Sequence, residues 1–189
     1  VSNYPYGISK LQGERGVLQM QDENFSVISL RQGTISGFSP RMRFDLIVNT
    51  MFKSAILNKQ ITINNPSIWR PIYDIRDAAN AFVRGIQANE QISGIFNVTS
   101  GNYTVGQVGD LVKYEVEKKT GEKIKLDIKN VQDFRNYKVT FDKARTYLGF
   151  QPLYTISDII DNLFDQMKYF GDFEKDEFYN IRTFKKLKL

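Results

Sequence analysis

The sequence contains neither cysteine nor histidine among its 189 residues. Disulfide frameworks, zinc sites built from Cys and His, Ser-His-Asp triads and Cys-His nucleophiles are therefore excluded. Any proton transfer must use tyrosine, lysine or a carboxylate. Because nothing points to an oxidising compartment, we expect a cytoplasmic protein.

Long hydrophobic runs are also missing. An apolar run such as 25–30 is far shorter than the ~20 residues that cross a bilayer, so no membrane association is expected. The sequence begins at Val1 without a signal-peptide pattern, and a helical pattern is under way by Tyr6, so we expect a fragment of a longer protein. Apolar residues make up 41% and charged residues 25%, which is typical of a globular domain and unlike disordered or fibrous chains.

The net charge of +5 favours anionic partners, either nucleic acid or phosphorylated small molecules. The basic C-terminal run 185–189 follows several aromatic residues, but no nucleic-acid-binding module accompanies it. We therefore disfavour nucleic-acid binding and expect a solvated, partly frayed terminus from Asp172 onward.

Hydrophobic spacing predicts an alternation of helices and strands. Helices are predicted at 6–21, 44–57, 78–88, 107–120, 142–148 and 156–170, and strands at 25–31, 61–63, 71–75, 95–98, 123–128 and 137–141. Asp77 is expected to cap the helix 78–88, and Gly121, Gly149 and Gly171 to end helices. Such alternation is typical of the α/β class.

Two stretches that look like ligand-binding motifs are rejected. The segment 101–106 has the glycine spacing of a P-loop, but Gln107 stands where lysine is needed. The acidic run 172–176 imitates the start of a calcium loop, yet Glu177 replaces the required glycine. No G-x-G-x-x-G or G-x-x-G-x-x-G turn follows a predicted strand. The sequence thus predicts no metal site and lacks the phosphate-binding turn of a dinucleotide fold.

Tyr6 and Lys10 lie four residues apart on the first predicted helix, so their side chains emerge on one face. A tyrosine hydroxyl titrates near pH ~10 and is a poor base at neutral pH unless a nearby cation favours its phenolate. A lysine one turn away supplies that cation. Tyr114 and Lys118 repeat the spacing, so spacing alone does not distinguish a catalytic pair from a solvated helix face.

Context separates the two pairs. The stretch 4–10, YPYGISK, resembles the YGxSK active-site helix of the extended short-chain dehydrogenase/reductase family, which includes nucleotide-sugar epimerases and dehydratases. Further matches follow in the family's order: Leu30-Arg31 with Gly37, then 69–77 (R-x-x-x-x-V-x-D), 96–98 (FNV), 133–135 (D-x-R) and 148–152 (LGF-x-P). A series of ordered matches spanning residues 4–152 is far more specific than any single one.

The resemblance implies an α/β fold: the C-terminal part of a Rossmann-type parallel sheet with a smaller, mixed α/β substrate-binding lobe. Residues 1–189 would form a partial domain, with the N-terminal glycine-turn half absent. The resemblance also implies that Tyr6 is the general acid/base on a sugar hydroxyl or ketone. Lys10 is implied to favour the tyrosine phenolate and to hold the ribose of a nicotinamide coenzyme, NAD or NADP.

The implied substrate-binding residues are Thr34, Asn49, Arg70 and Arg135. The two arginines are implied to hold the diphosphate of a nucleotide sugar, which suits the guanidinium fork. The chain departs from the family pattern at Thr34, where many members have Asn, at Ser36, where many have Tyr, and at Asp74, where many have His.

The function implied is NAD(P)-dependent epimerisation or dehydration of a nucleotide sugar through a transient keto-sugar. Alternatives are a non-catalytic dinucleotide-binding sensor or scaffold of the same fold, and a nucleotide-sugar ketoreductase. The resemblance also implies a homodimer through the helix of Tyr6, whose exposed face includes Leu11, Val17, Leu18 and Met20. The sugar, the nucleotide base and the choice between NAD and NADP stay open.

Overall fold

The computed structural model of the protein describes residues 5–131 and 136–187. The helices of these residues are α1 (Pro5–Leu18), α2 (Ile47–Asn58), α3 (Ile75–Ile86), α4 (Val105–Thr120), α5 (Asp142–Leu148), α6 (Ile156–Asp165), α7 (Met167–Phe170), the 3₁₀ turn η1 (Asp176–Phe178) and α8 (Asn180–Lys186). The strands are β1 (Ile28–Gln32), β2 (Thr34–Ser36), β3 (Gln60–Asn64), β4 (Trp69–Asp74), β5 (Gly94–Val98), β6 (Gly101–Thr104) and β7 (Lys125–Lys129).

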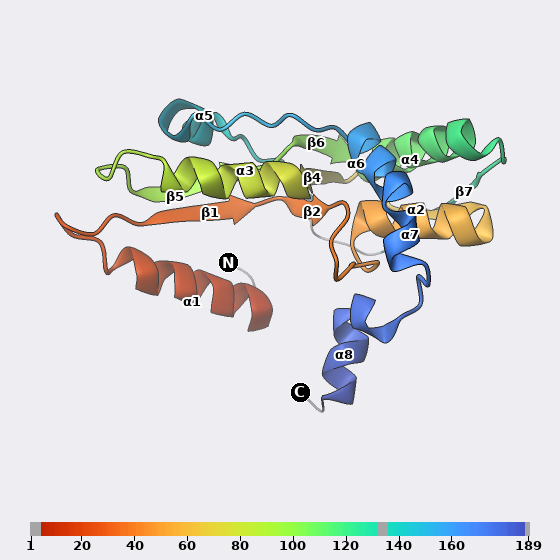
Figure 1. The fold of residues 1–189 in the computed structure, drawn as a ribbon, viewed down its shortest axis with the longest axis horizontal. Helices are drawn as coiled ribbons and strands as arrows, with labels where there is room; N and C mark the ends of the chain where they lie inside the picture. Colours follow the sequence, from red (N-terminus) through yellow and green to blue (C-terminus); the bar gives the residue numbers. More distant parts are fainter. Residues whose placement is uncertain (1–4, 132–135, 188–189) are drawn as a thin grey trace.

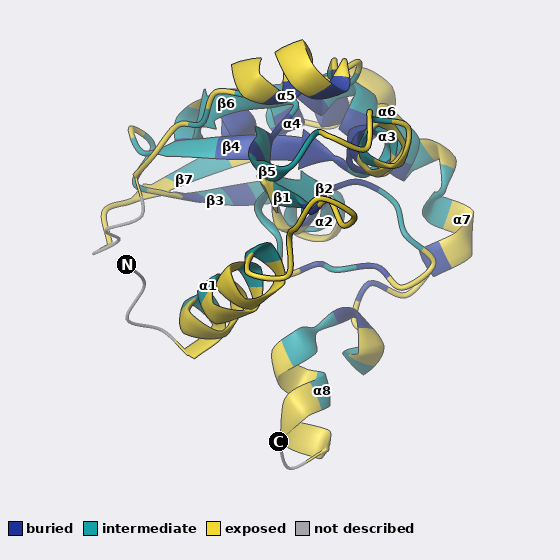
Figure 2. Ribbon diagram, turned by 90° about the vertical axis from the view of Figure 1, so that its left-hand side faces the viewer, coloured by how far each residue is buried: buried dark blue, intermediate teal, exposed yellow. Residues whose placement is uncertain are grey.

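Two lobes are visible in Figure 1. The first lobe contains α1, β1, β5, α3 and α5, and the second contains α2, β3, β7, α4 and α6; the β2–β4–β6 sheet lies between them. The helices α1 and α8 extend from the packed layers and are largely exposed (Figure 2). No helix in the described ranges is both long and apolar enough to cross a membrane.

The described residues form three small sheets. Strand β1 pairs in parallel with β5, and β3 pairs in parallel with β7. Strand β4 pairs in parallel with β2 and antiparallel with β6. Parallel pairing together with covering helices confirms the α/β class expected from the sequence.

Gly33 lets the chain pass from one lobe to the other between β1 and β2. Its N–H donates to the carbonyl oxygen of Val98 at 2.9 Å, at the end of β5. A Cβ atom at this position would lie 3.0 Å from Oγ1 of Thr99 and 3.1 Å from the carbonyl oxygen of Pro71. Because a side chain would crowd this crossing, glycine allows β1 to leave β5 and continue as β2 beside β4.

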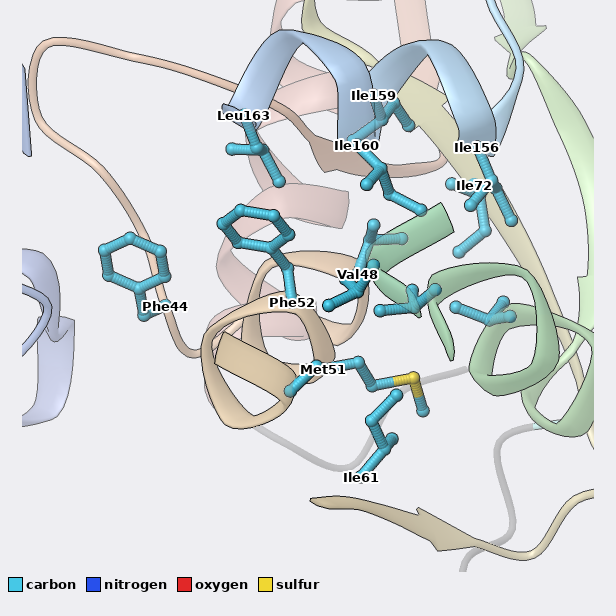
Figure 3. Packing of buried hydrophobic residues seen from close by; sticks show 14 of the residues in the cluster. Phe44, Val48, Met51, Phe52, Ile61, Ile72, Ile156, Ile159, Ile160 and Leu163 are labelled. Carbon is cyan, nitrogen blue, oxygen red and sulfur yellow. The ribbon is translucent and has the colours of Figure 1, made fainter. Parts of the chain in front are cut away.

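Each lobe has its own hydrophobic core. The larger core packs α2 against α4, α6 and β3, and Figure 3 shows Val48 and Phe52 of α2 directed toward Ile160 and Leu163 of α6. The smaller core joins β5, α3 and α5 around Phe96. Burying such side chains contributes about 1.5–3 kcal/mol each, so the two cores fix the lobes that frame the junction.

Two predicted glycine ends of helices are confirmed, whereas α4 begins earlier than predicted. It begins at Val105 rather than at Gln107, and Thr104 and Gln107 form a reciprocal capping box that satisfies backbone N–H groups of the first turn. Gly121 ends α4 at φ 73°, and Gly149 ends α5 at φ 62°, both in the left-handed region that favours glycine.

The predicted cap of α3 is wrong. Helix α3 begins at Ile75 rather than at 78, and its cap is Asp74, whose side chain accepts a hydrogen bond from the N–H of Arg76 at 2.7 Å. Asp77 lies inside the first turn and is fully buried. Its carboxylate accepts instead from the N–H of Leu153 at 2.8 Å and from the hydroxyl of Ser100 at 2.5 Å. Asp74 and Asp77 are both acidic and both suit a helix N-cap. Hydrogen bonds from distant residues hold Asp77, so Asp74 caps the helix.

The predicted strand 137–141 does not form. Side chains hold this segment in place of a backbone ladder: the amide of Asn102 donates to the carbonyl oxygen of Val139 at 2.8 Å and accepts from its N–H at 3.0 Å. The N–H of Trp69 donates to Oδ1 of Asn136 at 2.9 Å.

The predicted helix 156–170 is divided into α6 and α7 at Gln166, which lies between them. The prediction of a solvated tail from Asp172 is also wrong in part, since Phe173 and Phe178 are buried. Their rings lie 5.0 and 5.7 Å from the ring of Phe44, centroid to centroid. The C-terminal segment therefore completes the larger core and covers the loop before α2.

Candidate functional site

Tyr6 and Lys10 lie in the first two turns of α1. Figure 2 shows α1 extending from the packed layers, with its first turn farther from the sheets than its last turn. Both side chains are exposed on this helix.

The geometry of the pair suits cooperation between the two side chains. The ammonium Nζ of Lys10 lies 5.6 Å from the centroid of the Tyr6 ring, and the ring is 74% exposed. The second pair looks alike, with Nζ of Lys118 at 5.9 Å from the Tyr114 ring. What differs is position in the fold, because Tyr6 lies on α1 and Tyr114 lies on α4 in the second lobe.

Thr34 and Arg70 lie in the sheet between the lobes. Thr34 begins β2 and is in register with Ile72 of β4. Arg70 lies two residues before Ile72 in the same strand, opposite Tyr103 of β6, and its guanidinium donates to the carbonyl oxygen of Trp69 at 2.9 Å. The structure thus brings two of the implied substrate-binding residues into one sheet. Arg135 lies outside the described residues.

Asn49 is 2% exposed, and its amide holds the loop that precedes α2. Oδ1 accepts from the N–H of Gly37 at 3.1 Å, while Nδ2 donates to the carbonyl oxygens of Gly37 at 3.3 Å and of Arg43 at 3.0 Å. Gly37 has φ 115°, and a Cβ atom there would lie 3.1 Å from Cγ2 of Ile75. In this structure the amide of Asn49 therefore fixes the loop 37–43.

The sequence did not predict a buried polar network that lies at the junction between the lobes. The carboxylate of Asp77 joins α3 to the β5–β6 connection through Ser100, whose hydroxyl also accepts from the N–H of Asp74 at 2.9 Å. Burial, followed by the nearby charge of Asp77, raises the pKa of Tyr73 well above its usual range. The segment 69–77 was singled out as a family match, but only the fold shows that Asp77 ties α3 to the β5–β6 and α5–α6 connections.

Two departures from the family pattern are neighbours in space. Ser36 and Asp74 are in register across β2 and β4. The carboxylate of Asp74 accepts two hydrogen bonds from the guanidinium of Arg76, at 3.0 and 2.8 Å, and that guanidinium lies 3.6 Å from the ring centroid of Tyr154. The hydroxyl of Ser36 is buried and has no hydrogen-bond partner among the residues that the structure describes. The altered position 74 thus forms a local ion pair at the start of α3, and the guanidinium of Arg76 also donates to the carbonyl oxygen of Asp158 on α6 at 3.1 Å.

Tyr6 and Lys10 do not line the cavity at the amino end of β5. This cavity, of about 320 Å³, lies between the α3–β5 connection and α5. It is lined by Gln91, Ile92, Ser93, Phe96, Lys143 and Tyr147. Within 5–131 and 136–187 there is also no group of three or more carboxylates that could hold a metal ion. The surface around Tyr6 is open in this chain.

Comparison with known proteins identifies the class of protein that this fold and site define. A family described as "NAD dependent epimerase/dehydratase family" matches residues 1–99, slightly more than half of the 189-residue chain. The chain belongs to this family, and the resemblance drawn from the motifs is confirmed.

Solved structures of nucleotide-sugar enzymes share the fold. UDP-N-acetylglucosamine 4-epimerase from Bacillus cereus matches 95% of this chain and 58% of its own, with a TM-score of 0.74 and 24% identity. UDP-glucuronic acid 4-epimerase from Bacillus cereus, in complex with UDP-glucuronic acid and NAD, matches 89% and 54%, with a TM-score of 0.71 and 22% identity. dTDP-glucose 4,6-dehydratase from Bacillus anthracis, in complex with NAD, matches 89% and 55%, with a TM-score of 0.71 and 16% identity.

This chain therefore spans little more than half the length of the structures that it matches. The likeness confirms the Rossmann-type α/β fold class, of which the chain covers a part.

Proposed function

We propose that this chain is the second half of an NAD(P)-dependent enzyme that epimerises or dehydrates a nucleotide sugar through a transient keto-sugar. In this proposal, residues 1–189 form the later part of the Rossmann fold interleaved with the substrate-binding lobe. The glycine turn that holds the coenzyme diphosphate comes from residues outside this sequence. Membership of the epimerase/dehydratase family and partial coverage of its solved structures support this division.

Tyr6 is the proposed general acid/base. Its phenolic oxygen accepts the proton of a sugar hydroxyl as that hydroxyl is oxidised to a ketone, and it returns the proton when the ketone is reduced. Lys10 places a positive charge one turn away, which favours the phenolate form needed for the first step. The exposed ring of Tyr6 leaves the hydroxyl accessible to a substrate.

The same two side chains fit the ribose of a nicotinamide coenzyme. A phenol and an ammonium group are suitable hydrogen-bond partners for ribose hydroxyls, and both side chains are exposed on α1. When bound, the coenzyme supplies hydride transfer. Two of the similar solved structures contain NAD, and one of these also contains UDP-glucuronic acid, which supports a nucleotide-sugar substrate.

One observation carries the proposal: the family match includes a Tyr-Lys pair whose side chains lie together on an exposed helix, with Nζ of Lys10 5.6 Å from the centroid of the Tyr6 ring. The test uses the polypeptide that contains this chain together with its glycine-turn half. The protein is incubated with NAD and with UDP-, dTDP-, ADP- and GDP-linked sugars, and products are identified by mass spectrometry and NMR.

Tyr6→Phe removes only the hydroxyl, so we expect coenzyme binding and folding to persist while turnover falls by about 10²–10⁴-fold. Tyr114→Phe is the matched control, because it removes the same hydroxyl from a tyrosine that also has a lysine four residues on. We expect the control to keep wild-type turnover. A Tyr6→Phe enzyme within about threefold of wild type would remove Tyr6 from the mechanism. Coenzyme binding without turnover of any nucleotide sugar would instead support a sensor or scaffold.

A further inference from the structure

The helix that carries Tyr6 and Lys10 has no buried residue. Glu14 links it to β1 by hydrogen bonds: Nε and one terminal nitrogen of Arg31 donate to its two carboxylate oxygens at 2.8 and 2.6 Å, and the hydroxyl of Ser29 donates at 3.1 Å. The Glu14 side chain is only 11% exposed. The hydrogen bond from Arg31 lowers the pKa of this carboxyl, which therefore stays ionised at neutral pH.

The position of Glu14 on the helix lets it set the rotation of α1 about its own axis. Gly7, Leu11, Glu14 and Leu18 are the half-buried positions of the helix, and their spacing puts the other three on the same helix face as Glu14, which bonds to β1. Each residue advances about 100° around a helix, so each four-residue step advances only about 40° beyond a full turn. The steps from Tyr6 to Lys10 and from Lys10 to Glu14 therefore keep all three on neighbouring faces. Because so little of α1 is buried, a change at Glu14 is transmitted along the helix to both functional side chains.

We propose that Glu14, through its paired hydrogen bonds to Arg31 and Ser29, is a positioning residue that fixes the rotation and height of α1 on β1. In this role it holds the Tyr6 hydroxyl and the Lys10 ammonium in their working positions without touching substrate. This inference rests on the proposed function for the chemistry of Tyr6. It adds that Glu14 orients the helix that carries Tyr6. An exposed ion pair with a single contact contributes little to stability. A guanidinium that bonds to both carboxylate oxygens also fixes the relative orientation of the two side chains.

A double-mutant cycle tests this inference in the polypeptide with its glycine-turn half. Misplacing a catalytic group by about 1 Å can cost about 100-fold in rate, so we expect Glu14→Gln and Arg31→Gln each to lower kcat by at least about 10-fold. KM for the nucleotide sugar should stay within about twofold, because the implied substrate contacts lie on other elements. The double variant should be no slower than the slower single variant, since both changes break the same contact.

The control variant is Glu122→Gln, which breaks the surface ion pair between Lys59 and Glu122 in the second lobe. We expect its kcat within twofold of wild type. Ser29→Ala removes one of the three hydrogen bonds to Glu14 and should lower kcat by about two- to threefold. This milder variant keeps the test decisive if Glu14→Gln unfolds, as monitored by thermal melting.

Amide hydrogen exchange gives a reading that does not depend on turnover. In Glu14→Gln the amides of α1 should exchange at least about 10-fold faster, while those of α4 stay unchanged. If the wild-type protein turns over no nucleotide sugar, the proposed function fails, yet faster exchange in α1 still supports the link to β1. Unchanged exchange in α1, a kcat within twofold of wild type, or losses that multiply in the double variant would each overturn the positioning role.

Discussion

At the scale of single residues, substrate affinity is expected to depend on two arginines that are far apart in the sequence. Arg70 lies in the sheet between the lobes, and Arg135 lies in a stretch outside the described residues. Each charge-assisted hydrogen bond to a diphosphate contributes about 1.5–3 kcal/mol. Arg70→Ala and Arg135→Ala should therefore each weaken nucleotide-sugar binding by roughly 10- to 150-fold, measured by isothermal titration calorimetry.

Coenzyme affinity should change little in the same variants, because its implied contacts are Lys10 and the glycine turn. Arg145→Ala serves as the matched control, since this arginine pairs at 2.9 Å with Asp142 on α5 in the first lobe. Equal losses of both affinities would indicate a folding defect. Unchanged nucleotide-sugar affinity would assign the arginines a structural role only.

At the scale of elements, the C-terminal segment depends on Glu174. Its carboxylate accepts from Nζ of Lys53 on α2 at 2.8 Å and from the guanidinium of Arg182 on α8 at 2.9 Å. These hydrogen bonds, Lys53 first and Arg182 second, lower the pKa of Glu174 below its ordinary value of 4.5. Since the folded-state pKa is the lower one, the stabilisation is present above pH 4.5 and is lost as pH falls through the folded-state pKa.

We expect Glu174→Gln to speed amide exchange in 172–187 at pH 7 without changing exchange in α4. As pH falls from 7 to 3, the wild-type segment should approach the behaviour of the variant. Hydrogen exchange with mass spectrometry measures both effects. Wild type and variant that still differ as much at pH 3 as at pH 7 would contradict the role given to this carboxylate.

At the scale of the whole molecule, α1 presents an apolar surface that suits a second copy of the chain. Val17 is 48% exposed and Met20, just after α1, is 62% exposed. Leu11 and Leu18, which we also expected on the outer face, are half-buried on the side toward β1. A twofold contact presents the same patch from both subunits, so exposed apolar residues on one helix are consistent with the homodimer implied by the family resemblance.

Val17→Glu should therefore convert a dimer to a monomer at micromolar concentration, because two carboxylates would meet near the symmetry axis without partners. Ile128→Glu on β7 is the matched control, since Ile128 is also exposed and apolar but lies in the second lobe. Sedimentation velocity measures the mass of both variants. A wild-type protein that sediments as a monomer would exclude this interface.

Local signals in the sequence were sufficient for most elements. The end of α4 was predicted from Gly121, whereas its start lies at Val105, two residues before the predicted start, where Thr104 and Gln107 form a capping box. The segment 137–141 does not form a strand: the N–H of Tyr137 donates to the backbone carbonyl oxygen of Trp69 at 3.5 Å, but the side chain of Asn102 takes both backbone hydrogen bonds of Val139. Local patterns predict the secondary structure that a segment favours, whereas the backbone that a strand pairs with depends on the fold.

The candidate site divides in the same way. The pairing of Tyr6 with Lys10 lies within one helix, so it could be predicted from their spacing and from the surrounding motif. By contrast, the burial of Asp77, the loop held by Asn49 and the link from Glu14 to Arg31 join segments up to 76 residues apart. No local pattern predicts which of several polar residues will be buried and form a hydrogen bond with a residue far away in the sequence.

By itself, the sequence determined the α/β class and the family, and it singled out Tyr6 and Lys10 as the proposed reactive pair, because these depend on short-range periodicity and on ordered motifs. Only the tertiary structure decided which carboxylates became structural and where the chain crosses between lobes at Gly33. It also decided that the C-terminal segment closes the larger core. The physical reason is that burial and hydrogen-bond pairing are set by the whole packed molecule, since a polar group leaves water only where another segment supplies its partner.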